Sequence, residues 1–110
     1  MEEEHGVRRT DILAGNHDLA LKAINGDEPM MTSLVALCAA VLYGWDDHAM
    51  LEEISKCEND MGELFGTPIG WYATAAWHLL TGEEYEGDND AIKGIMSDRM
   101  GYFKKGQVVQ

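Results

Sequence analysis

The longest apolar stretch of the chain, LVALCAAVLYGW, runs from Leu34 to Trp45, and its first ten residues carry no charged or amide side chain. A bilayer span needs about 20 such residues, so the stretch is too short to cross a membrane. Its alanines and leucines favour a helix over a buried strand. Pro29 suits the first helical position and Gly44 suits a left-handed C-cap, which together predict a helix over 29–43. Because this helix is apolar nearly all round, we expect it to be buried at the centre of the fold.

An interrupted helix is predicted over 10–24, upstream of the apolar stretch. Thr10 suits the N-cap of its first turn, Gly15 and Asn16 interrupt it, and Asn16 can cap the second part. Asn25 and Gly26 end it with a pair suited to a left-handed turn. The second part has one apolar face, formed by Leu19, Ala20, Ala23 and Ile24.

The most regular periodicity follows Trp45. Apolar residues recur there at alternating steps of four and three residues, which is typical of an amphipathic helix. Asp46 suits its N-cap and Gly66 its end, so the pattern predicts a helix over 46–65. The apolar stripe consists of Met50, Ile54, Cys57, Met61 and Leu64.

Two more helices are predicted in the second half of the chain. Thr67 followed by Pro68 is typical of a helix start, and Thr81 with Gly82 is typical of an end, which predicts an uncharged helix over 68–80 beside helix 29–43. Asp88 or Asn89 can cap a last helix over 90–100, which Gly101 would end. Its apolar stripe is Ala91, Ile92, Ile95, Met96 and Met100.

These elements predict an all-α protein, a compact bundle of about five helices. Two helical hairpins, 29–65 and 68–100, would stack together with the N-terminal helix. The domain organisation follows: a flexible acidic arm at 1–9, a single helical domain at 10–101 and a C-terminal tail at 102–110.

The charge balance changes the range of partners that the bundle could have. Twenty acidic residues against eight lysines and arginines give a net charge of −12. Nucleic acid and anionic membranes are disfavoured as partners because phosphate binding needs clustered basic residues, whereas a basic protein surface is favoured. Neither a signal peptide nor a transmembrane segment can be read, so we expect a cytoplasmic location, or the cytoplasm of a host. In such a reducing compartment, Cys38 and Cys57 are interpreted as two small buried hydrophobes rather than a disulfide.

The acidic residues gather in two segments. Residues 46–66 hold seven carboxylates against Lys56 alone, and 83–90 hold five carboxylates and no basic residue. One interpretation is a solvated outer surface, which every amphipathic helix needs. The other is a negative surface whose carboxylates imitate phosphates and occupy the arginines and lysines of a partner. The candidate partner-binding residues are Asp46, Asp47, Glu52, Glu53, Glu63, Glu83, Glu84 and Glu86.

No motif for a cofactor, a metal or a catalytic centre can be read. Gly87 precedes Asp88, Asn89 and Asp90, which is the wrong order for a calcium loop, and no two histidines have the i, i+4 spacing of a helical zinc site. A phosphate-binding loop and a G-x-S-x-G nucleophile motif are both missing. We therefore expect a protein without enzymatic activity, bound metal or cofactor.

Aromatic residues and one histidine keep two alternatives open. Trp71, Thr74 and His78 share one side of helix 68–80 and could line a small-ligand or active site, although a lone histidine more often bonds a backbone carbonyl. Trp71, Trp77 and Tyr85 could instead form an interface, either in a homodimer or in a larger assembly.

Three functions follow in order of preference. The first is a small acidic interaction module, such as a phage- or plasmid-encoded antagonist that binds the basic surface of a nucleic-acid-binding protein. The second is a structural or regulatory subunit that self-associates through its aromatic helical face. The third is a small-ligand binder or an enzyme built around His78.

Overall fold

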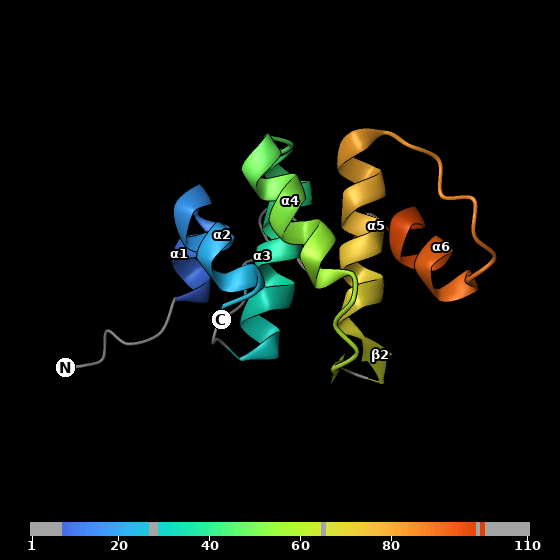
Figure 1. The fold of residues 1–110 in the computed structure, drawn as a ribbon. Helices are drawn as coiled ribbons and strands as arrows, with labels where there is room; N and C mark the ends of the chain where they lie inside the picture. The colour runs from blue at the N-terminus through green and yellow to red at the C-terminus, as the bar shows by residue number, and fades with distance from the viewer. Residues whose placement is uncertain (1–7, 27–28, 65, 99, 101–110) are drawn as a thin grey trace.

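The computed structural model describes residues 8–26, 29–64, 66–98 and 100, which form six helices and one two-stranded sheet (Figure 1). The prediction of an all-α bundle is confirmed, with a small antiparallel hairpin added to it. The helices are α1 (Arg9–Leu13), α2 (His17–Ile24), α3 (Met30–Tyr43), α4 (His48–Cys57), α5 (Ile69–Thr81) and α6 (Asp90–Ser97), and the strands are β1 (Glu63–Leu64) and β2 (Thr67–Pro68).

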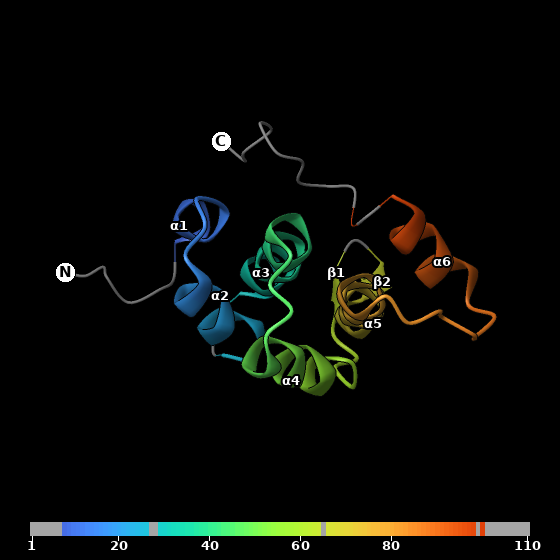
Figure 2. The same ribbon diagram turned by 90° about the horizontal axis from the view of Figure 1, so that it is seen from above.

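Helices α3 and α5 form the centre of the molecule, as the sequence predicts for its two uncharged helices. They pack side by side, with α1 and α2 against α3 on one side and α6 against α5 on the other (Figure 2). Every residue of α3 from Thr32 to Val41 is buried. Gly44 ends α3 at φ 69°, in the left-handed conformation that the sequence predicts. No helix of the described ranges combines the length and the apolar character needed to span a bilayer.

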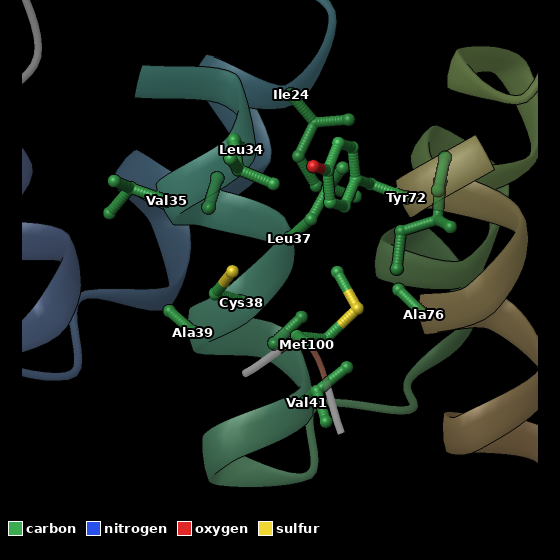
Figure 3. Close-up of a cluster of buried hydrophobic side chains, with 14 of the residues drawn as sticks. Ile24, Leu34, Val35, Leu37, Cys38, Ala39, Val41, Tyr72, Ala76 and Met100 are labelled. Atoms are coloured by element: carbon green, nitrogen blue, oxygen red, sulfur yellow. The ribbon is translucent and has the colours of Figure 1, made fainter. Parts of the chain in front are cut away.

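The core contains buried side chains from all six helices, and its central part joins residues of α2, α3 and α5 with Met100, which follows α6 (Figure 3). Met100 is only 2% exposed although its φ is 71°, and its N–H donates to the carbonyl of Ile95. The buried Ser33 hydroxyl links α3 to α2 and is satisfied there, since it donates to the carbonyl of Ala23 at 2.8 Å. Cys38 and Cys57 are free and buried, in agreement with their interpretation as small hydrophobes. Burial raises the pKa of each thiol to about 12, which keeps both protonated.

Helix α4 is much shorter than the predicted helix over 46–65, and this prediction is wrong in its second half. The helix starts after Asp47, whose carboxylate caps the N–H of Met50, and it ends at Cys57. The Asp60 carboxylate then accepts the N–H of Gly62, a local turn that competes with helix. Met61, predicted in the apolar stripe, is 73% exposed.

The segment after α4 is fixed by backbone bonds to the start of α5. The N–H of Ile69 donates to Gly62 and that of Gly70 to Asp60, at 2.8 and 3.0 Å. Between them β1 and β2 pair in antiparallel register, Glu63 with Pro68, and Gly66 turns the chain at φ 78°. Gly66 therefore makes a hairpin turn rather than the predicted helix end.

Several other helix ends in the structure differ from the predicted ones. Thr10 lies inside α1 rather than capping it, and Arg9, assigned by the sequence to the arm, is its first residue. Pro29 and Pro68 occupy N-cap positions, one residue before the predicted first turn. Asn25 has φ −118°, so it makes no left-handed turn. Asn16 and Asn89 do cap α2 and α6, as predicted, although α6 ends at Ser97.

The predicted hairpin pairing is only partly retained. Helices α5 and α6 pack against each other, whereas the main neighbours of α4 are α5 and α2 rather than α3. The contact between α2 and α4 creates the surface described below. Residues 1–7, Gly101 and the predicted tail at 102–110 lie outside the described residues.

Candidate partner-binding surface

A groove of about 440 Å³ runs between α2 and α4 and is open to solvent. Leu21 and Ala49 contribute apolar surface, and the carboxylates of Asp18, Glu52 and Glu53 lie around it with Lys22 as the only basic lining residue. The sequence predicts Glu52 and Glu53 as partner-binding residues but not Asp18. Asp18 lies 34 residues before Glu52 in the chain, and only the packing of α2 against α4 brings them together.

Asp47 connects the two helices at one end of this surface. His17 of α2 bonds to its carboxylate at 2.8 Å through Nε2, and the same carboxylate caps α4. The hydrogen bond to Asp47 raises the pKa of His17, with burial opposing this and Asp18 adding to it. Burial is the largest single influence on the pKa of Asp47 and acts to raise this pKa. The bonds from His17 and from the Met50 N–H together outweigh burial, so the pKa of Asp47 is lowered. Asp47 is therefore a structural residue as much as a surface charge.

An aromatic stack supports the His17–Asp47 contact. The ring of His17 meets Trp45 edge-on at 5.3 Å, and Trp45 stacks on Tyr43 at 5.1 Å. The Tyr43 hydroxyl in turn donates to the carbonyl of Leu13, which ties the end of α3 to α1. Residues from three helices thus hold the loop that carries Asp46 and Asp47.

Glu53 is partly neutralised within the protein. The Asn25 side chain donates to its carboxylate at 2.9 Å and to its backbone carbonyl at 2.7 Å, and Lys56 lies 3.2 Å from its other oxygen. The Asn25 bond is the main cause that lowers the pKa of Glu53. Glu52 has only His48, at 3.8 Å, and Asp46 has no ion pair among the described residues. Asp18 lies 3.5 Å from Nδ1 of His17, so Asp18 and Glu52 each have one histidine contact and are less neutralised than Glu53.

Glu63 does not belong to this surface. It lies in β1, in the hairpin at the opposite end of α4 from Asp47 (Figure 1). The remaining acidic candidates, Glu83, Glu84 and Glu86, follow the C-terminus of α5 and are all exposed, with no ion pair to any described residue. The structure thus divides the predicted acidic surface into at least three separate places.

His78 takes the structural role that a lone histidine most often has. Its Nδ1 bonds to the carbonyl of Glu83 at 2.8 Å, which requires the proton on that nitrogen. Its ring meets Trp77 and Tyr85 edge-on at 5.2 and 5.5 Å. Thr74, predicted to line a pocket with His78, donates its hydroxyl proton to the backbone carbonyl of Gly70.

Glu58 lies on the same side of α5 as Thr74 and His78. Burial raises the pKa of Glu58, while its contact with the Thr74 side chain and the charge of His78 oppose this rise. The groove beside His78, however, opens on the other side, toward Tyr85 and α6, and neither Trp71 nor Thr74 lines it. The predicted Trp71–Thr74–His78 pocket is therefore replaced by one with different walls.

The aromatic residues predicted as an interface lie against the core. Trp71, Trp77 and Tyr85 are half-buried and pack on the buried cluster, and Tyr72 is buried on the same helix. Helix α5 is thus covered on most sides within the monomer. Of the large apolar residues in the described ranges, Tyr43 and Met61 are exposed. Self-association stays a prediction.

Neither a metal site nor a similarity to known proteins adds to the functional assignment of the described residues. In the described part of the chain, no three histidine, cysteine or acidic side chains gather in a way that could hold a metal ion. Comparisons with known protein families, with curated proteins and with solved structures found no match. The functional argument therefore depends on the surface itself.

Proposed function

We propose that the protein is a non-enzymatic interaction protein that binds the basic surface of a partner protein through the groove between α2 and α4. The observation that carries this proposal is the convergence of Asp18, Glu52 and Glu53 on one groove that also exposes apolar surface. Carboxylates held on helices can accept charge-assisted hydrogen bonds from arginine and lysine, and the apolar floor can cover their alkyl stems.

The net charge supports the same proposal at longer range. A surplus of 12 negative charges attracts a basic protein before contact and repels nucleic acid. The narrower form of the proposal is an antagonist, of phage or plasmid type, that occupies arginines and lysines which otherwise hold phosphates. The partner's own nucleic acid would then compete for the same side chains.

A charge-reversal pair tests the groove with a matched control. Asp18→Lys with Glu52→Lys reverses two exposed carboxylates, whose ion-pair partners among the described residues are His17 and His48, and Glu63→Lys with Asp98→Lys reverses two exposed carboxylates elsewhere. Both double variants have the same net charge. With an octalysine peptide as probe in low salt, we expect the groove variant to lose roughly tenfold in affinity, or about 1.4 kcal/mol. Titration calorimetry over a range of salt concentrations measures both affinity and salt dependence.

The control variant shows whether octalysine binds at the α2–α4 groove or responds only to the net negative charge of the protein. The Glu63/Asp98 variant should keep an affinity close to that of the unmodified protein. Equal losses in the two variants would mean that the peptide responds to net charge alone, and the proposal would then be abandoned.

A further inference from the structure

A second groove, of about 470 Å³, lies at the C-terminal end of α5, between the segment after that helix and α6. Leu79 and Met96 give it apolar surface, and Glu83, Glu84 and Tyr85 come from the segment after α5. The sequence predicts the two glutamates as partner-binding residues and Tyr85 as an interface residue, without connecting them. The fold places all three in one groove.

The wall of the groove is held in place by hydrogen bonds at the end of α5. The N–H of Gly82 donates to the carbonyl of His78 at 2.9 Å, and the N–H of Glu83 donates to the Thr81 hydroxyl at 3.2 Å. The bond from His78 Nδ1 to the carbonyl of Glu83 closes the same turn. Because these bonds form within the free protein, little ordering is needed when a ligand enters.

Tyr85 depends on a glycine for its position. Its ring lies edge-on to His78, and a Cβ atom on Gly87 would overlap the Tyr85 ring and hydroxyl. Glycine at 87 therefore allows the ring to fold back over the chain. This makes Gly87 a position where the groove can be altered without changing any charge.

Three independent features favour a positive charge in the groove. Glu83 and Glu84 supply carboxylates, the C-terminus of α5 carries the negative end of its dipole, and the Tyr85 ring can contact a cation. The basic residues that line the groove are His78, whose Nδ1 is bonded to the carbonyl of Glu83, and Lys93 on the α6 side. Lys93 makes no ion pair with any described residue, so it leaves both glutamates available.

We propose that this groove receives a lysine side chain of a protein partner, with its alkyl stem over Leu79 and Met96 and its ammonium group near Glu83, Glu84 and Tyr85. The groove is open, so a side chain can enter while its backbone stays outside. The inference rests on the proposed function for the basic character of the partner, but it names a different part of the surface.

The test uses the full chain, labelled with ¹⁵N, and the capped pentapeptide Gly-Ser-Lys-Ser-Gly. Titration should shift the amide signals of Tyr85, Gly87 and Met96 and saturate. The same peptide with norleucine in place of lysine has an equal stem without the charge, and it should cause no saturable shift at these residues. Equal binding of the norleucine peptide would overturn the proposal.

Two variants separate the site from an effect on folding. Lys93→Met removes the opposing charge and should tighten binding of the lysine peptide by about two- to fivefold, a gain that misfolding cannot produce. Gly87→Ala displaces Tyr85 and should weaken binding at least severalfold. Unchanged affinity in both variants would also overturn the proposal.

The two binding proposals fail separately. If octalysine binds at the α2–α4 groove while the pentapeptide leaves Tyr85 and Met96 unshifted, the lysine groove is wrong and the proposed function stands. If the pentapeptide shifts Tyr85 and Met96 while the Asp18/Glu52 variant binds octalysine normally, the α2–α4 groove is wrong and the lysine groove stands.

Discussion

Two glycines inside helices differ in what surrounds them, although the sequence does not distinguish them. A Cβ atom on Gly70 would lie 2.8 Å from the carbonyl oxygen of Asp60 and closer still to that of Glu58, which are backbone atoms that cannot rotate away. A Cβ on Gly94 of α6 would meet nothing within 4 Å. Alanine should therefore have opposite effects at the two positions.

We expect Gly70→Ala to lower the free energy of unfolding by roughly 1–3 kcal/mol, because the end of α4 must move away from α5. Gly94→Ala should raise it by about 0.5–1 kcal/mol, because alanine restricts the unfolded chain and suits a helix. Urea unfolding followed by circular dichroism measures both. A stabilised Gly70→Ala variant would contradict the close approach of the two segments.

Helices α2 and α4 are joined by an ion pair that depends on pH. The pKa of His17 lies above 6.5 in the folded state, so its stabilising contribution is complete below pH 6.5 and is lost as pH rises through the folded pKa. The pKa of Asp47 lies below 3.8, so its contribution is present above pH 3.8 and is lost as pH falls through the folded pKa. The pair therefore contributes most between these two values.

His17→Gln tests this link. The loss in free energy of unfolding should be largest between pH 4 and 6.5 and should shrink by up to about 1 kcal/mol toward pH 9, since the pair is partly exposed. Asp47→Asn keeps a capping oxygen and should remove the same pH-dependent part. A loss from His17→Gln that is constant over this pH range would mean that His17 acts only through its contact with Trp45.

At the scale of the whole molecule, charge repulsion dominates the surface. The chain has 20 acidic and 8 basic residues, and within the described ranges the lysine and arginine ion pairs are Arg8–Asp11 and Lys56–Glu53. Such exposed pairs contribute little, whereas the surplus of like charge opposes the compact state.

Raising the sodium chloride concentration from about 10 mM to 500 mM shortens the Debye length from roughly 30 Å to a few ångström and screens this repulsion. We therefore expect the Tm of the protein to rise with salt at pH 7, measured by calorimetry. A Tm that falls over this range would show that attractive ion pairs outweigh the repulsion.

The sequence determined the helical class and the two central helices. An apolar run with Pro29 and Gly44 at its ends, and a second uncharged run that ends at Gly82, contain their own start and stop signals. These signals are local, because caps and left-handed glycines act within a few residues. For the same reason Asn16 and Asn89 could be identified as caps from the sequence alone.

Only the tertiary structure decided where α4 ends and which acidic residues meet. The periodicity of Met61 and Leu64 matches a helix, but the bonds from Ile69 and Gly70 to the segment after α4 require the chain to turn there. Asp18 and Glu52 line one groove although their helices are far apart in the chain. Tyr85 and Met96 line the other because the segment after α5 folds back beside α6. Contacts of this kind depend on how whole helices pack, and no local pattern in the sequence encodes them.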